Sequence, residues 1–134
     1  MTDAGSPESR PRYRALVVED DPAIRRLVEK LLRRQEIEID LAADGATALR
    51  KLRENSYSVL VLDLMVPEVN GFEIIDFLKK ERLSVPVAVV SAVSQQALSK
   101  LDLNVVRLVI SKPFDVEEFT RSIVELCSGS TASA

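Results

Sequence analysis

The feature that most constrains the fold of this chain is the apolar run from Val59 to Leu62, which ends on the carboxylate of Asp63. Four consecutive branched apolar residues are typical of a strand that is buried on both faces, as in the middle of a parallel sheet. Pro67 and Gly71 interrupt this pattern before a helical period begins. Open α/β sheets bind their ligands at the carboxyl ends of the strands, so Asp63 is the first candidate for a functional residue.

The same alternation of a short apolar strand and an amphipathic helix runs through most of the chain. Strands are predicted at 13–18, 37–42, 59–62, 87–90 and 105–110. A helix is predicted after each strand, and the fourth, around 94–101, is the weakest because its middle is polar. Five strands that alternate with five helices predict an α/β fold: a doubly wound five-stranded parallel sheet with right-handed crossovers and helices on both faces.

Apolar residues at helical spacing indicate which helix faces lie against this sheet. The stripes comprise Ile24, Leu27, Val28, Leu31 and Leu32 in the first helix, and Val116, Phe119, Ile123 and Leu126 in the last. Asp21 and Asp115 precede these helices and are predicted to be their N-caps. Neither G-x-G-x-x-G nor G-x-x-x-x-G-K-[ST] occurs, which removes the main support for dinucleotide-binding and P-loop functions.

Composition limits the chemistry that the chain can support. The 134 residues are expected to form one domain at 13–128, between a disordered tail at 1–12 and a second tail at 129–134. The absence of histidine excludes Ser-His catalysis and the usual zinc sites. A single cysteine, Cys127, cannot form an internal disulfide, so a cytoplasmic location is expected. The net charge of −3 and the strand-sized apolar runs indicate neither a nucleic acid nor a membrane partner.

Polar residues converge on one edge of the predicted sheet. Glu19 and Asp20 follow the first strand, Asp63 the third, Ser91 the fourth and Lys112 the fifth. Three carboxylates in one crevice repel each other, and a hard cation such as Mg²⁺ (or Mn²⁺) relieves this repulsion. A carboxylate can also attack phosphorus and form an aspartyl phosphate. These residues therefore predict Mg²⁺-dependent phosphoryl transfer to Asp63, with Lys112 and Ser91 neutralising the transferred group.

Four segments of the chain resemble the signature motifs of response-regulator receiver domains, the phosphoacceptors of two-component signalling. They are the acidic segment at 17–25, the segment at 63–71, the pair Ser91-Ala92 and the triplet at 112–114. Each motif is weak alone, but the four occur in the right order at strand ends, and the resemblance spans 13–127. It implies a flavodoxin-like (βα)5 fold with the strand order 2-1-3-4-5.

The resemblance also implies how the metal would be held. Asp63 would be the phosphorylated aspartate and a ligand of Mg²⁺. Asp20 would bind the metal directly, whereas Glu19 would act through water or the metal shell. Met65 would offer its backbone carbonyl to the metal.

The remaining implied roles concern the phosphoryl group. Lys112 would pair with it, Ser91 would turn toward it, and Pro113 would follow a cis peptide bond. The family usually has an aromatic residue three positions before this lysine, where this chain has Val109. The common switch between a hydroxyl residue and an aromatic ring therefore cannot work here in its usual form. The alternative is a degenerate receiver that acts as a phosphorylation-independent protein-interaction module.

Partners and rival functions follow from the same residues. The resemblance implies a sensor histidine kinase or phosphotransfer protein as phosphoryl donor, and a downstream effector protein or domain. It implies no enzyme activity beyond the chain's own phosphorylation and dephosphorylation. A phosphohydrolase of the aspartyl-phosphate type would need a second acid at the position of Met65, and the acids at 19–21 would repel the phosphate of a flavin. No helix-turn-helix remains to bind DNA. Either the protein stands alone, or the chain belongs to a longer regulator.

Overall fold

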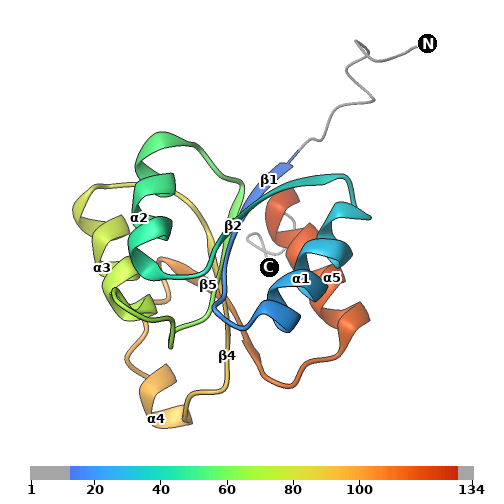
Figure 1. The fold of residues 1–134 in the computed structure, drawn as a ribbon. Helices are drawn as coiled ribbons and strands as arrows, with labels where there is room; N and C mark the ends of the chain where they lie inside the picture. Colours follow the sequence, from blue (N-terminus) through green and yellow to red (C-terminus); the bar gives the residue numbers. More distant parts are fainter. Residues whose placement is uncertain (1–12, 130–134) are drawn as a thin grey trace.

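The computed structural model describes residues 13–129, which form a five-stranded parallel sheet between two layers of helices (Figure 1). In chain order the elements are β1 (Tyr13–Val18), α1 (Pro22–Arg33), β2 (Ile37–Ala42), α2 (Gly45–Glu54), β3 (Val59–Leu62), α3 (Gly71–Lys80), β4 (Val87–Ser91), α4 (Gln95–Leu98), β5 (Val106–Ser111) and α5 (Val116–Ser128). The strand order β2-β1-β3-β4-β5, with parallel pairing throughout, confirms the predicted fold. The tails predicted at 1–12 and 130–134 lie outside the described residues.

Burial along the strands follows their position in the sheet. All residues of β3 and β4 are buried, as expected for strands that helices cover on both faces. The two edge strands, β2 and β5, instead alternate between more and less exposed residues. The last four residues of β1 are buried as well. The groups at the carboxyl ends of β1, β3 and β4 therefore follow the most buried segments of the sheet.

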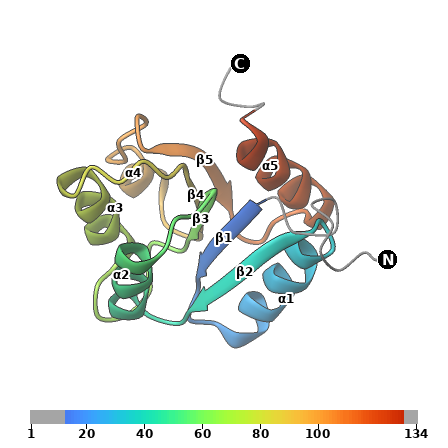
Figure 2. The ribbon, with the colours of Figure 1, turned by 90° about the horizontal axis from the view of Figure 1, so that it is seen from above.

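Two helical layers cover the sheet, as seen from above in Figure 2. α2 and α3 pack on one face, whose core includes Leu52, Ile74 and Leu78. α1 and α5 pack on the other face, where Leu32 and Phe119 are fully buried. Each layer gives the sheet an apolar cover, which is the arrangement that the helical stripes predicted.

Two residues of the predicted stripes are exposed instead of inward. Leu27 lies at the margin of the α1 stripe farthest from Leu32, and Val116 lies in the first turn of α5. The prediction that both face the sheet was wrong, because an apolar stripe can be wider than the strip of helix that contacts the sheet.

The helices begin at residues with capping side chains. Asp21 is the N-cap of α1 and Pro22 occupies its first position, and Asp115 is the N-cap of α5, all as predicted. A full capping box, which was not predicted, begins α3: Asn70 and Glu73 each accept a hydrogen bond from the backbone N–H of the other. These caps fix where each loop at the functional edge of the sheet ends.

The fourth helix is the weakest element, as predicted, and shorter than expected. It comprises only Gln95–Leu98, and none of its residues is buried. A single turn in which only Ala97 and Leu98 are partly buried has little apolar area with which to hold it against the sheet. Among residues 13–129, no helix combines the length and apolar character that crossing a membrane requires.

Candidate functional site

The carboxyl ends of four neighbouring strands bring the predicted residues together. Glu19 and Asp20 follow β1, Asp63 follows β3, Ser91 ends β4, and Lys112 follows β5. These strands are adjacent and parallel, so their carboxyl ends lie at the same edge of the sheet. Residues separated by 93 positions, Glu19 and Lys112, are consequently in hydrogen-bond contact.

The three acidic residues form a compact cluster of oxygen ligands. Glu19, Asp20 and Asp63 each offer one carboxylate oxygen, and these oxygens lie within 4.8 Å of one another. Glu19 and Asp63 are only 4% and 7% exposed, whereas Asp20 is exposed to solvent. Carboxylate oxygens are the ligands that Mg²⁺ prefers, and three of them at this separation fit a hard divalent cation. The cluster is open to solvent on the side of Asp20.

Lys112 lies between the two buried acids. Its Nζ donates hydrogen bonds to Oε1 of Glu19 at 2.7 Å and to Oδ2 of Asp63 at 2.9 Å. Burial is the largest influence on the pKa of Lys112 and would lower it, but the two carboxylates outweigh burial and raise this pKa above its usual value. The lysine therefore stays charged. The Lys112–Pro113 peptide bond is cis, as expected.

Asp63 accepts a hydrogen bond from each of three groups. Its Oδ1 accepts from the backbone N–H of Met65 at 3.1 Å and from Oγ of Ser91 at 2.9 Å, while its Oδ2 accepts from Lys112. Burial would raise the pKa of Asp63, but these donors together outweigh burial and hold the pKa below its usual value. Asp63 is therefore an ionised carboxylate at neutral pH, which is the form that can act as a nucleophile.

Glu19 is held differently from Asp63. Its Oε1 accepts from Lys112, and its Oε2 accepts from the backbone N–H of Asp21 at 3.1 Å. Burial raises the pKa of Glu19, and the nearby charge of Asp63 adds to this effect, while the hydrogen bonds oppose it. Both carboxylate oxygens of Glu19 therefore have donors, as do those of Asp63.

The loop after β3 is held in place by close packing against α2. The backbone N–H of Gly45 donates to the carbonyl of Pro67 at 3.1 Å. A side chain at Gly45 would overlap the carbonyl group of Val69, so glycine is required for this approach. The same loop carries Met65, whose backbone N–H reaches Asp63 while its side chain is exposed.

Ser91 and Val109 differ in their relation to the site. Ser91 is fully buried, and its hydroxyl donates to Asp63. Val109 lies in register with Val89 but is 40% exposed on the edge strand. No aromatic ring at position 109 covers this part of β5, which agrees with the departure noted in the sequence.

Two features of the site were not predicted from the sequence. One is the direct contact of Lys112 with Glu19, which follows from side-chain geometry and not from any motif. The other is Arg25, whose Nη1 donates to the backbone carbonyl oxygens of Glu19 at 2.9 Å and Asp20 at 3.4 Å. An arginine in the first turn of the helix after the acidic segment was the signal that could have identified it.

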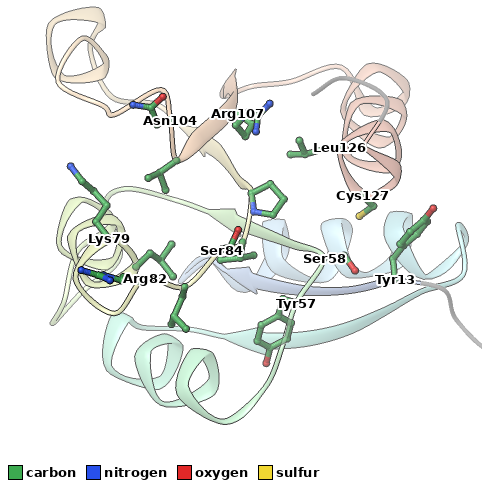
Figure 3. Close-up of a pocket in the computed structure, with 16 residues that line it drawn as sticks. Tyr13, Tyr57, Ser58, Lys79, Arg82, Ser84, Asn104, Arg107, Leu126 and Cys127 are labelled. Atoms are coloured by element: carbon green, nitrogen blue, oxygen red, sulfur yellow. The ribbon is translucent and has the colours of Figure 1, made fainter. Parts of the chain in front are cut away.

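A cavity of about 850 Å³ lies at the opposite, amino ends of the strands. Figure 3 shows residues around it, among them Tyr57 after α2, Arg82 after α3 and Cys127 in α5. None of the site residues lines it. The polar groups that converge at the carboxyl edge, and not the size of a cavity, therefore identify the candidate site.

Comparison with known proteins connects this site with a family. The family model described as "Response regulator receiver domain" matches residues 15–124. The alkaline phosphatase synthesis transcriptional regulatory protein SphR of Synechococcus elongatus is 34% identical over 131 residues, which cover 90% of this chain and 49% of that protein. The response regulator ArlR of Staphylococcus saprophyticus is 32% identical over 110 residues, or 81% of this chain and 49% of ArlR. The chain thus spans about half the length of these curated relatives.

Solved structures show the same architecture. The receiver domain of the Francisella response regulator 1452 superimposes with a TM-score of 0.81 at 26% identity, over 87% of this chain and 98% of that domain. The response regulator protein TrrA of Thermotoga maritima, solved in complex with Mg²⁺ and BeF, superimposes with a TM-score of 0.76 at 28% identity, over 85% and 98% of the two chains.

Proposed function

This chain belongs to the response-regulator receiver domain family, and we propose that Asp63 accepts a phosphoryl group in a two-component phosphorelay. The observation that carries the proposal is the environment of this carboxylate: ionised, buried, next to two further acids and in contact with Lys112 and Ser91. A phosphoacceptor needs a nucleophilic oxygen together with groups that compensate the charge of the incoming phosphate. The five residues supply both.

The proposed reaction transfers a phosphoryl group from a phosphohistidine of a sensor histidine kinase or phosphotransfer protein. One carboxylate oxygen of Asp63 attacks phosphorus, the P–O bond forms, and the P–N bond to the donor's imidazole breaks with its electron pair going to nitrogen. Lys112 then pairs with the phosphoryl oxygens, and the hydroxyl of Ser91 and the N–H of Met65 donate hydrogen bonds nearby. Each of these donors already contacts Asp63, so little reorganisation is needed.

A divalent cation, Mg²⁺ or Mn²⁺, fits the donor set and would neutralise charge between the carboxylates and the phosphate when bound. Asp20 and Asp63 would bind it directly, together with the backbone carbonyl of Met65. Glu19 would act through water or the metal shell, as the resemblance to receiver domains implies. The exposed carboxylate of Asp20 gives the cation its access from solvent.

Receiver domains are generally not enzymes with external substrates, and we propose the same here. The chain would promote only its own phosphorylation and dephosphorylation, and an effector protein or domain would read the modified state. The short α4 is the proposed moving part, because a single turn with no fully buried residue, held to the core mainly by the partly buried Leu98, can be displaced at small cost. The domain boundaries 13–128 and a cytoplasmic location remain predictions.

A second function, phosphorylation-independent protein binding, is favoured by Val109. An exposed valine in place of an aromatic residue leaves β5 without the usual partner of Ser91. In this alternative the surface near β5 would bind its partner whether or not Asp63 is modified.

Intact-protein mass spectrometry after incubation with a small phosphodonor tests the proposal. We expect one phosphoryl adduct that requires Mg²⁺ and is absent from Asp63→Asn. Ser84→Ala, which changes an exposed hydroxyl away from the site, serves as the matched control and should still form the adduct. Failure of the wild-type protein to form an adduct while it binds Mg²⁺ would favour the phosphorylation-independent alternative.

A further inference from the structure

Arg25 contacts the acidic loop from the first turn of α1 without belonging to the acidic cluster. Its Nη1 donates hydrogen bonds to the backbone carbonyl oxygens of Glu19 at 2.9 Å and of Asp20 at 3.4 Å. The guanidinium is partly buried, and its planar donor group can serve two carbonyls at once. It therefore links the start of α1 to the end of β1.

These two carbonyl groups lie on either side of Asp20. The carbonyl of Glu19 belongs to the peptide that precedes the Asp20 Cα atom, and the carbonyl of Asp20 belongs to the peptide that follows it. Each peptide is planar, so holding both restricts the φ and ψ angles of Asp20. The second peptide is held again where the N–H of Asp21 donates to Oε2 of Glu19.

Asp20 depends on its backbone for orientation more than the other acids do. The carboxylates of Glu19 and Asp63 each accept hydrogen bonds of their own. Asp20 is exposed, and within residues 13–129 its carboxylate takes part in none of the hydrogen bonds found. Its direction toward the cluster is consequently set by the main chain that Arg25 holds.

We propose that Arg25 is a positioning residue of the cation site, which keeps the carboxylate of Asp20 directed toward Glu19 and Asp63. This inference rests on the proposed function, because it concerns the same metal site. The positive charge of Arg25 acts in the opposite direction, since a guanidinium near the cluster repels a divalent cation. When Arg25 is replaced, loss of positioning should raise the Kd for Mg²⁺, whereas loss of the positive charge should lower it.

Calorimetric titration with Mg²⁺ separates the two effects. In Arg25→Gln we expect the Kd for Mg²⁺ to rise by roughly tenfold, as for other residues that orient metal ligands. The matched control is Arg26→Gln, which removes the same charge from the next, exposed position of α1. Its Kd should stay unchanged or fall slightly. Arg25→Lys, which keeps the charge but lacks the planar donor group, should bind more weakly than the wild-type protein.

Each result decides the inference. A Kd for Arg25→Gln that equals or lies below that of Arg26→Gln would overturn it, because charge alone would then explain the effect. Melting in EDTA identifies a variant that is unfolded at the titration temperature. If Arg25→Gln is unfolded, Arg25→Lys decides: a Kd above the wild-type value supports positioning, and an equal Kd refutes it. If the wild-type protein itself binds no Mg²⁺, the proposed metal site fails, which is a separate outcome.

Discussion

Replacing Lys112 with methionine removes the ammonium between two buried acids and keeps a long, unbranched side chain. Nζ lies 2.7 Å from Oε1 of Glu19 and 2.9 Å from Oδ2 of Asp63. In Lys112→Met both carboxylates remain buried without the charge that compensates them. We expect a less stable protein in the absence of metal, and a larger stabilisation by Mg²⁺ than in the wild type because the cation no longer competes with an ammonium group.

The size of the effect can be worked out from burial. Breaking a buried ion pair by removing one partner costs about 3–5 kcal/mol. The Lys112 side chain is 16% exposed, which favours the lower end, about 3 kcal/mol. An unfolding entropy of about 2.1 cal/mol/K per residue amounts to roughly 0.25 kcal/mol/K for a domain of roughly 120 residues. The expected fall in Tm in EDTA is therefore about 12 °C.

Thermal melts followed by circular dichroism, in EDTA and in excess Mg²⁺, measure both parts of this prediction. Lys79→Met is the matched control, because Lys79 pairs with Asp102 at 2.9 Å but on the surface, where an ion pair contributes little. It should melt close to the wild type in both conditions. The reasoning is refuted if Lys112→Met melts like Lys79→Met in EDTA, or if Mg²⁺ raises its Tm by no more than that of the wild-type protein.

Three further predictions concern residues outside the acidic cluster. Burial raises the pKa of the Cys127 thiol to about 11 from 9.0, so its thiolate fraction at pH 8 is lower by about 100-fold. Its reaction with an aromatic disulfide reagent should be slower by about this factor than in the urea-unfolded protein, and equal rates would contradict the prediction. Gly45→Ala should lower stability by about 2 kcal/mol, because the new methyl group overlaps the carbonyl of Val69; an unchanged urea midpoint would show that the loop can move aside. Tyr57→Phe should cost about 1 kcal/mol through loss of the 2.7 Å hydrogen bond to Asp40. Burial and Asp40 raise the pKa of Tyr57 above 10.0. The contribution of this hydrogen bond to the free energy of unfolding is therefore full below about pH 10 and is lost as pH rises toward the folded-state pKa. The difference in urea midpoint from the wild type should therefore narrow above pH 10, and a constant difference would contradict this assignment.

The sequence predicted the fold well because hydrophobic periodicity decides which elements form. A short, wholly apolar run such as 59–62 is typical of a strand covered on both faces, and the structure buries all four residues. The predictions failed where hydrophobic periodicity does not show how wide the sheet-contacting face of a helix is, or at which residue a helix ends. Leu27 fits the α1 stripe but extends past the contact with the sheet, and the polar segment at 94–101 yields one turn where two were expected.

The candidate site was predictable in its membership but not in its internal contacts. Topology alone places Glu19, Asp63 and Lys112 at one edge, since parallel strands end together. Which group compensates which charge depends on side-chain geometry, and no pattern in the sequence encodes that Lys112 bridges both buried acids. The role of backbone carbonyls is still harder to predict, because the contact of Arg25 with the loop involves main-chain atoms that every residue possesses.

The distribution of compensating charge implies that this domain folds without a metal. Two of the three acids are buried and share the compensating charge of Lys112, while the third, Asp20, remains in solvent where its charge costs little. A site of this kind differs from structural zinc sites, whose ligands hold no stable fold until the metal binds. In the proposed function Lys112 would pair with a phosphoryl group on Asp63, and phosphorylation would then draw this lysine away from Glu19. The cation would then take over part of that compensation, which couples metal binding to the modified state more strongly than to folding.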